Sequence, residues 1–178
     1  MQYSGKAAVG AASVPPSPED TTFRTYKNRM PHWRSVGSTY FVTWRLAAQQ
    51  HDLSPPERDT VQQAILHFGG QRYDLLAHVV MTDHVHVLLE PTAEYKLETI
   101  VHTWKSFSAH QLQRLHGRDS NVWQKDYFNR IIRDERELRE TVRYILLNPS
   151  KRWPGTVGYR WLGLGGTEAA PTVDCLEP

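Results

Sequence analysis

Two histidines in the stretch MTDHVHVLLEP (81–91) have a spacing that suits metal ligands. His84 and His86 alternate with valines, and a period of two is typical of a β-strand. Residues two apart on a strand share a face and lie roughly 6.5 to 7 Å apart, so we expect both imidazoles to project together. Neutral imidazole binds divalent metals, but two histidines do not complete a site. The stretch predicts part of a metal site. The alternative is that both histidines are solvent-exposed and bind nothing.

A tyrosine and an asparagine near the end of a predicted helix (135–148) are candidates for the missing part. Tyr144 and Asn148 are four residues apart, so they lie above one another on one side of the helix. Both fall outside the stripe expected to face the core, which contains Leu138, Val142, Ile145 and Leu146. Asn148 could supply a third ligand, and Tyr144 could reach a substrate bound to the ion. The alternative is an ordinary amphipathic helix that Pro149 ends.

These candidates need a framework of strands and helices to hold them. The sequence predicts strands at 39–46, 73–81, 84–91 and 123–134, and helices at 54–69, 97–117 and 135–148. This order favours an α+β fold of the ferredoxin-like type. We expect a four-stranded antiparallel sheet with two helices on one face and an extra C-terminal helix, which carries Tyr144.

Composition divides the 178 residues into one folded domain and two ends. Residues 1–22 are small and Pro-rich, which predicts a flexible N-terminal segment. Residues 23–153 carry all the periodic segments and form the expected domain. Residues 154–178 turn Gly-rich and acidic and are interpreted as a loose C-terminal tail.

Basic residues are unevenly distributed along the chain. The 21 basic and 19 acidic residues give a net charge of only +2, but two stretches, 23–45 and 102–118, combine basic with aromatic residues and hold no acid. Such stretches are typical of nucleic-acid binding, because Lys and Arg side chains contact phosphates and aromatic side chains stack on unpaired bases. A solvated basic face over an aromatic core is the alternative. The candidate phosphate contacts are Arg24, Lys27, Arg29, Arg34, Lys105, Arg114, Lys151 and Arg152.

The same composition indicates where the protein works. Its one cysteine, Cys175, cannot form an intrachain disulfide, which favours a reducing compartment. No stretch has eighteen consecutive apolar residues, and the N-terminus lacks a signal-peptide pattern. We therefore expect a cytoplasmic, nucleoid-associated protein with no membrane partner.

Three separated motifs resemble those of one family. MTDHVHVLLEP, WKSFSAHQLQRL and VWQKDYFNRIIRDERELRETVRYILLNPSKR are similar in order and spacing to single-tyrosine HUH transposases of the insertion-sequence-200-like group, and in particular to REP-associated tyrosine transposases. The resemblance covers about residues 30 to 153. It places the family's histidine pair on His84 and His86, its nucleophile on Tyr144 and its polar metal ligand on Asn148.

The resemblance implies a chemistry and a substrate. Residues 23–153 would form an HUH catalytic domain that binds single-stranded DNA hairpins, such as REP-like palindromes, and uses Mg²⁺ or Mn²⁺. Tyr144 would form a covalent 5′-phosphotyrosine, and the free 3′-hydroxyl could later rejoin strands. Because the adduct keeps the bond energy, no nucleotide cofactor is expected, and the chain has neither a Walker loop nor a GxGxxG stretch.

Several alternatives stay open at this stage. Tyr127 is a rival nucleophile, His78 could support the ligands from a neighbouring strand, and the family's usual Pro-Asn before the first histidine is replaced by Thr82 and Asp83. A domesticated, catalytically silent hairpin-binding protein would keep the fold without the reaction. A metal-dependent phosphoesterase ranks last, because clustered carboxylates are not evident. Either a monomer or a homodimer is compatible with the sequence.

Overall fold

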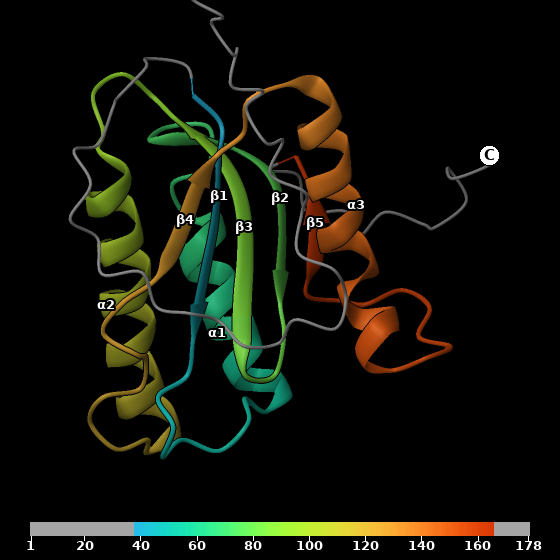
Figure 1. The fold of residues 1–178 in the computed structure, drawn as a ribbon. Coiled ribbons are helices and arrows are strands. Elements are labelled where there is room, and N and C mark those ends of the chain that lie inside the picture. The colour runs from blue at the N-terminus through green and yellow to red at the C-terminus, as the bar shows by residue number, and fades with distance from the viewer. Residues whose placement is uncertain (1–37, 166–178) are drawn as a thin grey trace, which may run out of the picture.

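The computed structural model describes residues 38–165 (Figure 1). None of the helices in this range has the length and apolar character needed to cross a membrane. The elements follow one another in the order β1 (Tyr40–Arg45), α1 (Pro55–Leu66), β2 (Tyr73–Val80), β3 (His84–Pro91), α2 (Leu97–His116), β4 (Phe128–Ile131), α3 (Glu135–Arg152) and β5 (Leu162–Leu164).

The strands form a single antiparallel sheet in the order β4-β1-β3-β2-β5 within the described part of the chain. Its first four strands have the predicted ferredoxin-like arrangement, so the fold class is confirmed. The prediction of four strands was one too few, because β5 pairs with the outer edge of β2. A strand of three residues is too short to give a period in the sequence.

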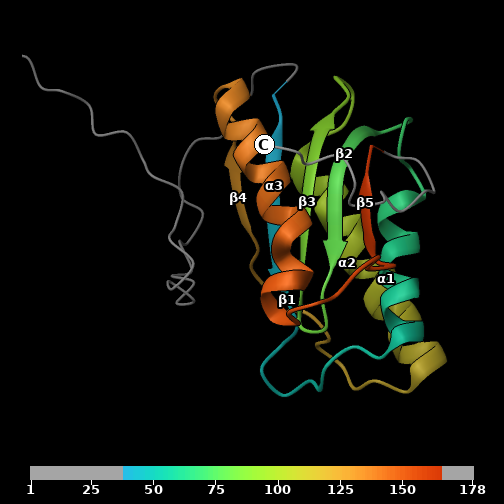
Figure 2. The ribbon, with the colours of Figure 1, turned by 90° about the vertical axis from the view of Figure 1, so that its right-hand side faces the viewer.

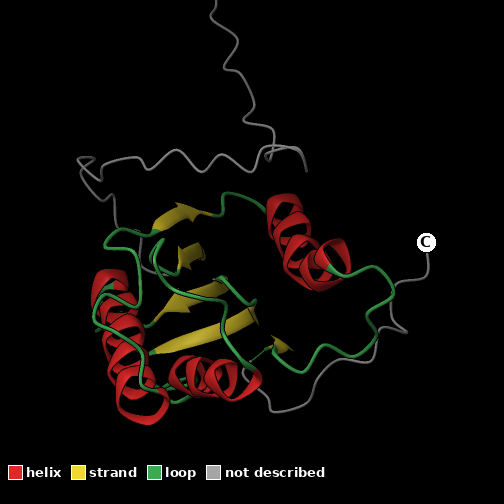
Figure 3. Cartoon of the chain, turned by 90° about the horizontal axis from the view of Figure 1, so that it is seen from below, coloured by secondary structure: helices red, strands yellow, loops and turns green. Residues whose placement is uncertain are grey.

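Helices cover both faces of the sheet. α1 and α2 pack on one face and α3 lies on the other (Figures 2 and 3). The side chains between the sheet and the first two helices form the larger core cluster, which is centred on Val42, Trp44 and Val87. A smaller cluster under α3 includes Phe41, Leu88 and Ile145. The alternation along β1 and β3 therefore divides their side chains between two different environments.

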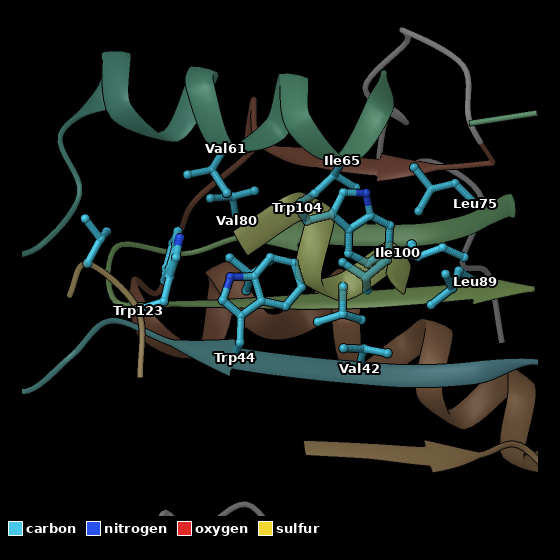
Figure 4. Close-up of a cluster of buried hydrophobic side chains, with 14 of the residues drawn as sticks. Val42, Trp44, Val61, Ile65, Leu75, Val80, Leu89, Ile100, Trp104 and Trp123 are labelled. Carbon is cyan, nitrogen blue, oxygen red and sulfur yellow. The ribbon is translucent and has the colours of Figure 1, made fainter. Parts of the chain in front are cut away.

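Large aromatic side chains, among them Trp44 and Trp104, fill the larger core (Figure 4). The rings of Trp44 and Trp104 stack with their centroids 5.8 Å apart. The Trp104 indole donates a hydrogen bond to the Tyr73 hydroxyl at 2.8 Å, and that hydroxyl donates to the carbonyl of Ile65 at 2.6 Å. Both the Trp104 N–H and the Tyr73 O–H therefore have acceptors, as buried polar groups require. These two bonds connect α2, β2 and α1 through the core.

Two predicted boundaries in the last part of the domain were wrong. β4 covers only residues 128–131 of the strand expected at 123–134, because 123 belongs to an isolated bridge with Leu46 and the following residues cross to the sheet edge. α3 does not end at Pro149 but continues to Arg152. Proline removes one amide hydrogen bond, yet the Trp153 amide still donates to the Pro149 carbonyl at 2.8 Å.

Residues that follow α3 are packed rather than loose. Trp153 stacks on Tyr159 with centroids 5.8 Å apart, and the Tyr159 hydroxyl donates to the Val80 carbonyl at 3.0 Å. Arg58 of α1 donates to that hydroxyl at 2.7 Å and lies 3.5 Å from the centre of the Trp161 ring. The expected loose tail from 154 onward is therefore corrected for residues up to 165. The N-terminal segment 1–22 and residues 166–178 lie outside the described residues.

A glycine in β5 makes room for a buried histidine. The His78 side chain is 2% exposed, and a Cβ atom at Gly163 would lie 2.3 Å from its Cε1. His78 Nε2 lies 3.1 Å from the Gln62 amide nitrogen of α1. Burial lowers the pKa of His78 to about 4, so the ring is neutral near pH 7. β5 can therefore approach β2 at this position only because residue 163 has no side chain.

We expect Gly163→Ala to lower the free energy of unfolding by about 1–3 kcal/mol, the usual cost of overpacking a core. Urea denaturation would measure the change. In a His78→Ala background the obstructing ring is absent, so the same substitution should cost little. An equal cost in both backgrounds would contradict this account of the contact.

A buried ion pair joins α1 to the end of α2. Arg118 forms a salt bridge with Glu57, and its guanidinium also donates to the carbonyls of His51 and Asp52 at 2.9 and 3.0 Å. Burial raises the pKa of Glu57, but hydrogen bonds from Arg118 and from the Ser54 amide outweigh it and lower the pKa to about 2. Ser54 is also the N-cap of α1, as the sequence predicted.

Glu57 should make stability depend on acid pH. Its folded pKa of about 2 lies below the ordinary 4.5, so its stabilisation is full above about 4.5 and is lost as pH falls toward 2. Glu57→Gln should lower the free energy of unfolding at pH 7 by roughly 1.5–3 kcal/mol, the range for hydrogen bonds to charged groups. Urea denaturation at several pH values should show this difference shrinking in acid; a constant difference would refute the assignment.

Candidate active site

The two histidines of β3 project from the sheet face that α3 covers. Their ring centroids are 4.7 Å apart, so the convergence expected from their spacing is present. His86 is 1% exposed and stacks on Phe41 of β1, with centroids 5.4 Å apart. His84 is half-buried at the end of the strand. The pair therefore forms a small imidazole surface that is buried at His86 and opens to solvent at His84.

Each imidazole has one nitrogen held by a neighbouring side chain. His84 Nδ1 lies 2.7 Å from Asp83 Oδ1, and His86 Nδ1 lies 2.6 Å from the hydroxyl of Thr43, its cross-strand partner. The Nε2 atom of His86 is buried without a hydrogen-bond partner among the described residues. A buried polar atom with no partner is uncommon in a folded protein. His86 Nε2 is therefore a candidate for a ligand contact.

Charge around the pair favours neutral imidazole at His86. Burial lowers the pKa of His86 well below its ordinary value, and the positive charge of Arg45 lowers it further. Asp83 accepts hydrogen bonds from His84 and from Arg45, the latter at 2.5 Å, and these hold the pKa of Asp83 far below its ordinary value. His86 is therefore neutral near pH 7, which is the form that binds metals.

Tyr144 lies directly beside the histidines. Its ring centroid is 5.2 Å from that of His86 and 6.1 Å from that of Phe41, both in edge-to-face arrangements. The Lys151 ammonium lies 4.9 Å from the centre of the Tyr144 ring. The side of α3 that carries the tyrosine therefore faces β3 across Phe41, as the sequence hypothesis required.

Asn148 is buried on α3, with 9% of its surface exposed. It lies on the same side of the helix as the buried Thr141 and Ile145, whereas the sequence placed it outside the core-facing stripe. Three residues of the predicted stripe do face the core: Ile145 is buried, and Leu138 and Val142 pack against the same cluster. The prediction was incomplete, because the buried side of α3 extends to Thr141 and Asn148. The sheet face below α3 carries Thr43 and the histidines beside apolar residues such as Leu88.

The rival candidates occupy other positions. Tyr127 packs against the core on the α1 and α2 side. Burial, with a contribution from the negative charge of Glu98, raises the pKa of Tyr127 to about 12. His78 contacts Gln62 of α1 and pairs across the sheet with Val87, so it lies on the face opposite to His86. The structure brings neither of them to the histidine pair.

The predicted phosphate contacts are distributed over several regions. Arg24, Lys27, Arg29 and Arg34 lie outside the described residues. Lys105 donates to the carbonyls of Gln124 and Lys125, at 2.8 and 2.9 Å, so it holds the segment before β4. Arg114 is exposed near the end of α2, and Lys151 and Arg152 are exposed at the end of α3. Among those that the structure describes, Lys151 lies close to Tyr144.

Sequence reasoning missed three site residues in β1. Phe41, Thr43 and Arg45 alternate along the strand and share the face that α3 covers. Their period of two is visible in TYFVTWRL (39–46), which could have identified them as one face. Their position opposite the histidines depends on the register with β3, and no local pattern in the sequence sets that register.

Two solved structures of other proteins resemble this chain. A REP-associated tyrosine transposase bound to a REP hairpin matches with a TM-score of 0.61 and 22% identity, over 75% of this chain and 82% of that chain. A putative transposase from Deinococcus radiodurans matches with a TM-score of 0.47 and 20% identity, over 66% of this chain and 95% of that chain. A comparison with curated proteins gives no match. At this identity, the first structure shows a shared fold.

The family follows from the sequence itself. The family described as transposase IS200 like matches residues 40–148, which is more than half of the chain and runs from the start of β1 to Asn148. The match therefore includes both histidines and the tyrosine. Members of this family are transposases, which bind and recombine DNA. The chain belongs to the IS200-like transposase family.

Proposed function

We propose that the protein is a single-stranded DNA endonuclease and strand transferase that acts on DNA hairpins through Tyr144. The observation that carries the proposal is the position of the Tyr144 ring, 5.2 Å from a buried imidazole whose Nε2 has no partner in the described chain. This contact between the proposed nucleophile and a buried imidazole without a partner at Nε2 supports the proposal.

The donor set fits a divalent metal. His84 and His86 would offer imidazole nitrogens, and the buried Asn148, four residues after Tyr144 on α3, would add an amide oxygen. This mixture of nitrogen and oxygen donors suits Mg²⁺ or Mn²⁺ together with water and a phosphate oxygen. When bound, such an ion supplies Lewis-acid polarisation of the scissile phosphate. Within the described residues no group of three His, Cys, Asp or Glu side chains could hold a metal alone, which makes Asn148 necessary to the proposal.

The chain's own residues would then carry the covalent step. The Tyr144 oxygen attacks phosphorus, the bond from phosphorus to the 3′ oxygen breaks, and the phenolic proton is lost while the leaving 3′ oxygen gains one. The DNA stays attached through a 5′-phosphotyrosine and keeps a free 3′-hydroxyl for rejoining. A phenol is a weak nucleophile because its pKa is near 10. Packing against Phe41 and His86 fixes its ring for in-line attack.

The substrate proposal rests on the structural neighbour and on exposed cations. That neighbour is a REP-associated transposase bound to a REP hairpin, and we extend hairpin binding to this chain. Lys151 and Arg152 are exposed at the end of α3, within reach of a strand that approaches Tyr144. Phosphate contacts of this kind position DNA without reading its sequence.

Tyr144→Phe should abolish a covalent protein–DNA adduct, because it removes the attacking oxygen and keeps the ring packing. The measurement is an incubation of purified protein with labelled single-stranded hairpins from the DNA that flanks its gene, with Mn²⁺ or with a chelator. Adducts would be separated under denaturing conditions.

Tyr127→Phe is the matched control and should keep the adduct, since Tyr127 lies on the other side of the sheet. Loss of the adduct in Tyr127→Phe alone would identify Tyr127, and not Tyr144, as the nucleophile. Hairpin binding without an adduct in any metal would replace the proposal with a catalytically silent binding protein. Turnover of small phosphoesters without an adduct would indicate the metal-dependent phosphoesterase.

Mn²⁺ should stabilise the parent protein against heat, and His86→Ala should remove that effect. A ligand at a hundred times its Kd adds about 2.7 kcal/mol of stability, which corresponds to a Tm increase on the order of 5–10 °C for a chain of this size. Thermal unfolding with and without Mn²⁺ is the measurement. His102→Ala removes an exposed histidine of α2 and should leave the increase unchanged. The same increase in His86→Ala would place the ion elsewhere.

A further inference from the structure

The two histidines have different hydrogen-bond partners, and the partners determine which nitrogen carries the proton. A neutral imidazole has one N–H donor and one nitrogen acceptor. An ionised carboxylate can only accept. His84 Nδ1 lies 2.7 Å from the carboxylate oxygen of Asp83, so in the neutral form of His84 the proton is on Nδ1. Its Nε2 therefore keeps a lone pair.

The partner of His86 leaves two possibilities. The Thr43 hydroxyl, 2.6 Å from Nδ1, can either accept from an Nδ1–H group or donate to a bare Nδ1. If it donates, the proton of His86 is on Nε2, where it would be a buried N–H group with no acceptor among the described residues. Buried N–H groups without an acceptor are rare. If it accepts, Nε2 keeps its lone pair and needs no acceptor.

Burial limits the side-chain hydrogen-bond partners of both Thr43 and His86 to each other. Thr43 is 3% exposed and His86 is 1% exposed, so water does not readily exchange for either partner. The two residues are also directly paired across β1 and β3, and Phe41 stacks on the imidazole. The ring is therefore held in one plane, and the hydroxyl is its side-chain hydrogen-bond partner.

We propose that Thr43 is a positioning residue, whose hydroxyl accepts from His86 Nδ1 and so presents the Nε2 lone pair of His86 to the same ion as that of His84. This inference rests on the metal site of the proposed function. Partners of this kind orient metal-binding histidines, and their loss commonly weakens metal affinity 10- to 100-fold. Thr43 would act through His86, without touching the ion or the DNA.

The test compares Thr43→Val with Thr43→Ser in the full chain. Valine keeps the shape of threonine and its preference for strands but removes the oxygen, whereas serine keeps the hydroxyl. Mn²⁺ binding would be measured by titration calorimetry. Nitrogen-15 NMR of the histidine rings in metal-free protein at neutral pH would identify the protonated nitrogen of His86. We expect Nδ1–H in the parent and in Thr43→Ser, and Mn²⁺ affinity about 10- to 100-fold weaker in Thr43→Val alone.

The outcomes separate this inference from the proposed function. An Nε2–H tautomer of His86 in the parent, or unchanged Mn²⁺ affinity in Thr43→Val, overturns the role of Thr43 and leaves the metal site standing. A parent that binds no Mn²⁺ overturns the metal site, and with it the role of Thr43. Equal weakening in Thr43→Val and Thr43→Ser would mean that the side chain only packs, which also overturns the proposal.

Discussion

Antiparallel pairing of β1 with β3 sets Thr43 opposite His86 and Arg45 opposite His84, and the arrangement of the site depends on this register. A shift by one residue would turn the side chains of one strand to the other face. It would bring valines under α3 and carry the imidazoles into the tryptophan core. The apolar side chains Val85, Val87 and Leu89, all buried against α1 and α2, therefore hold the histidines in place from the opposite side of the sheet.

α3 is held to the sheet near both of its ends. Near its start, Arg130 of β4 donates to the Thr141 hydroxyl at 3.0 Å and pairs with Glu137 at 3.0 Å. Beyond its end, Trp153 and Tyr159 stack and connect the chain to Val80 and Arg58. The tyrosine lies between these two attachments. Its distance from the histidines is thus set by packed elements rather than by a loop.

The sequence predicted features that follow from residue spacing within one strand or helix. It predicted fewer of the features that depend on contacts between residues far apart in the chain. The period of two in HVHV and the spacing of Tyr144 and Asn148 follow from strand and helix geometry, so the sequence alone is enough to select these residues. Thr43 could not be selected, because its role comes from a partner 43 positions away. Asn148 was expected beside the core-facing stripe and lies within the buried side of α3, because the way in which α3 docks on the sheet decides which of its residues are buried, and the helix sequence alone does not give that. β5 was missed because its pairing with β2, and not its own sequence, makes it a strand.

The connection of β4 to β1 determines when the histidines and the tyrosine can meet during synthesis. β4 pairs with the outer edge of β1, with Arg130 beside Phe41, and only then brings α3 across the sheet. Contacts between residues so far apart in sequence form late, because a long loop must close first. When the segment from β1 to α2 has emerged from the ribosome, both histidines and the strand that supports them have emerged. Tyr144 has not. On the proposed mechanism, the nascent chain could not attack DNA until α3 had emerged and docked.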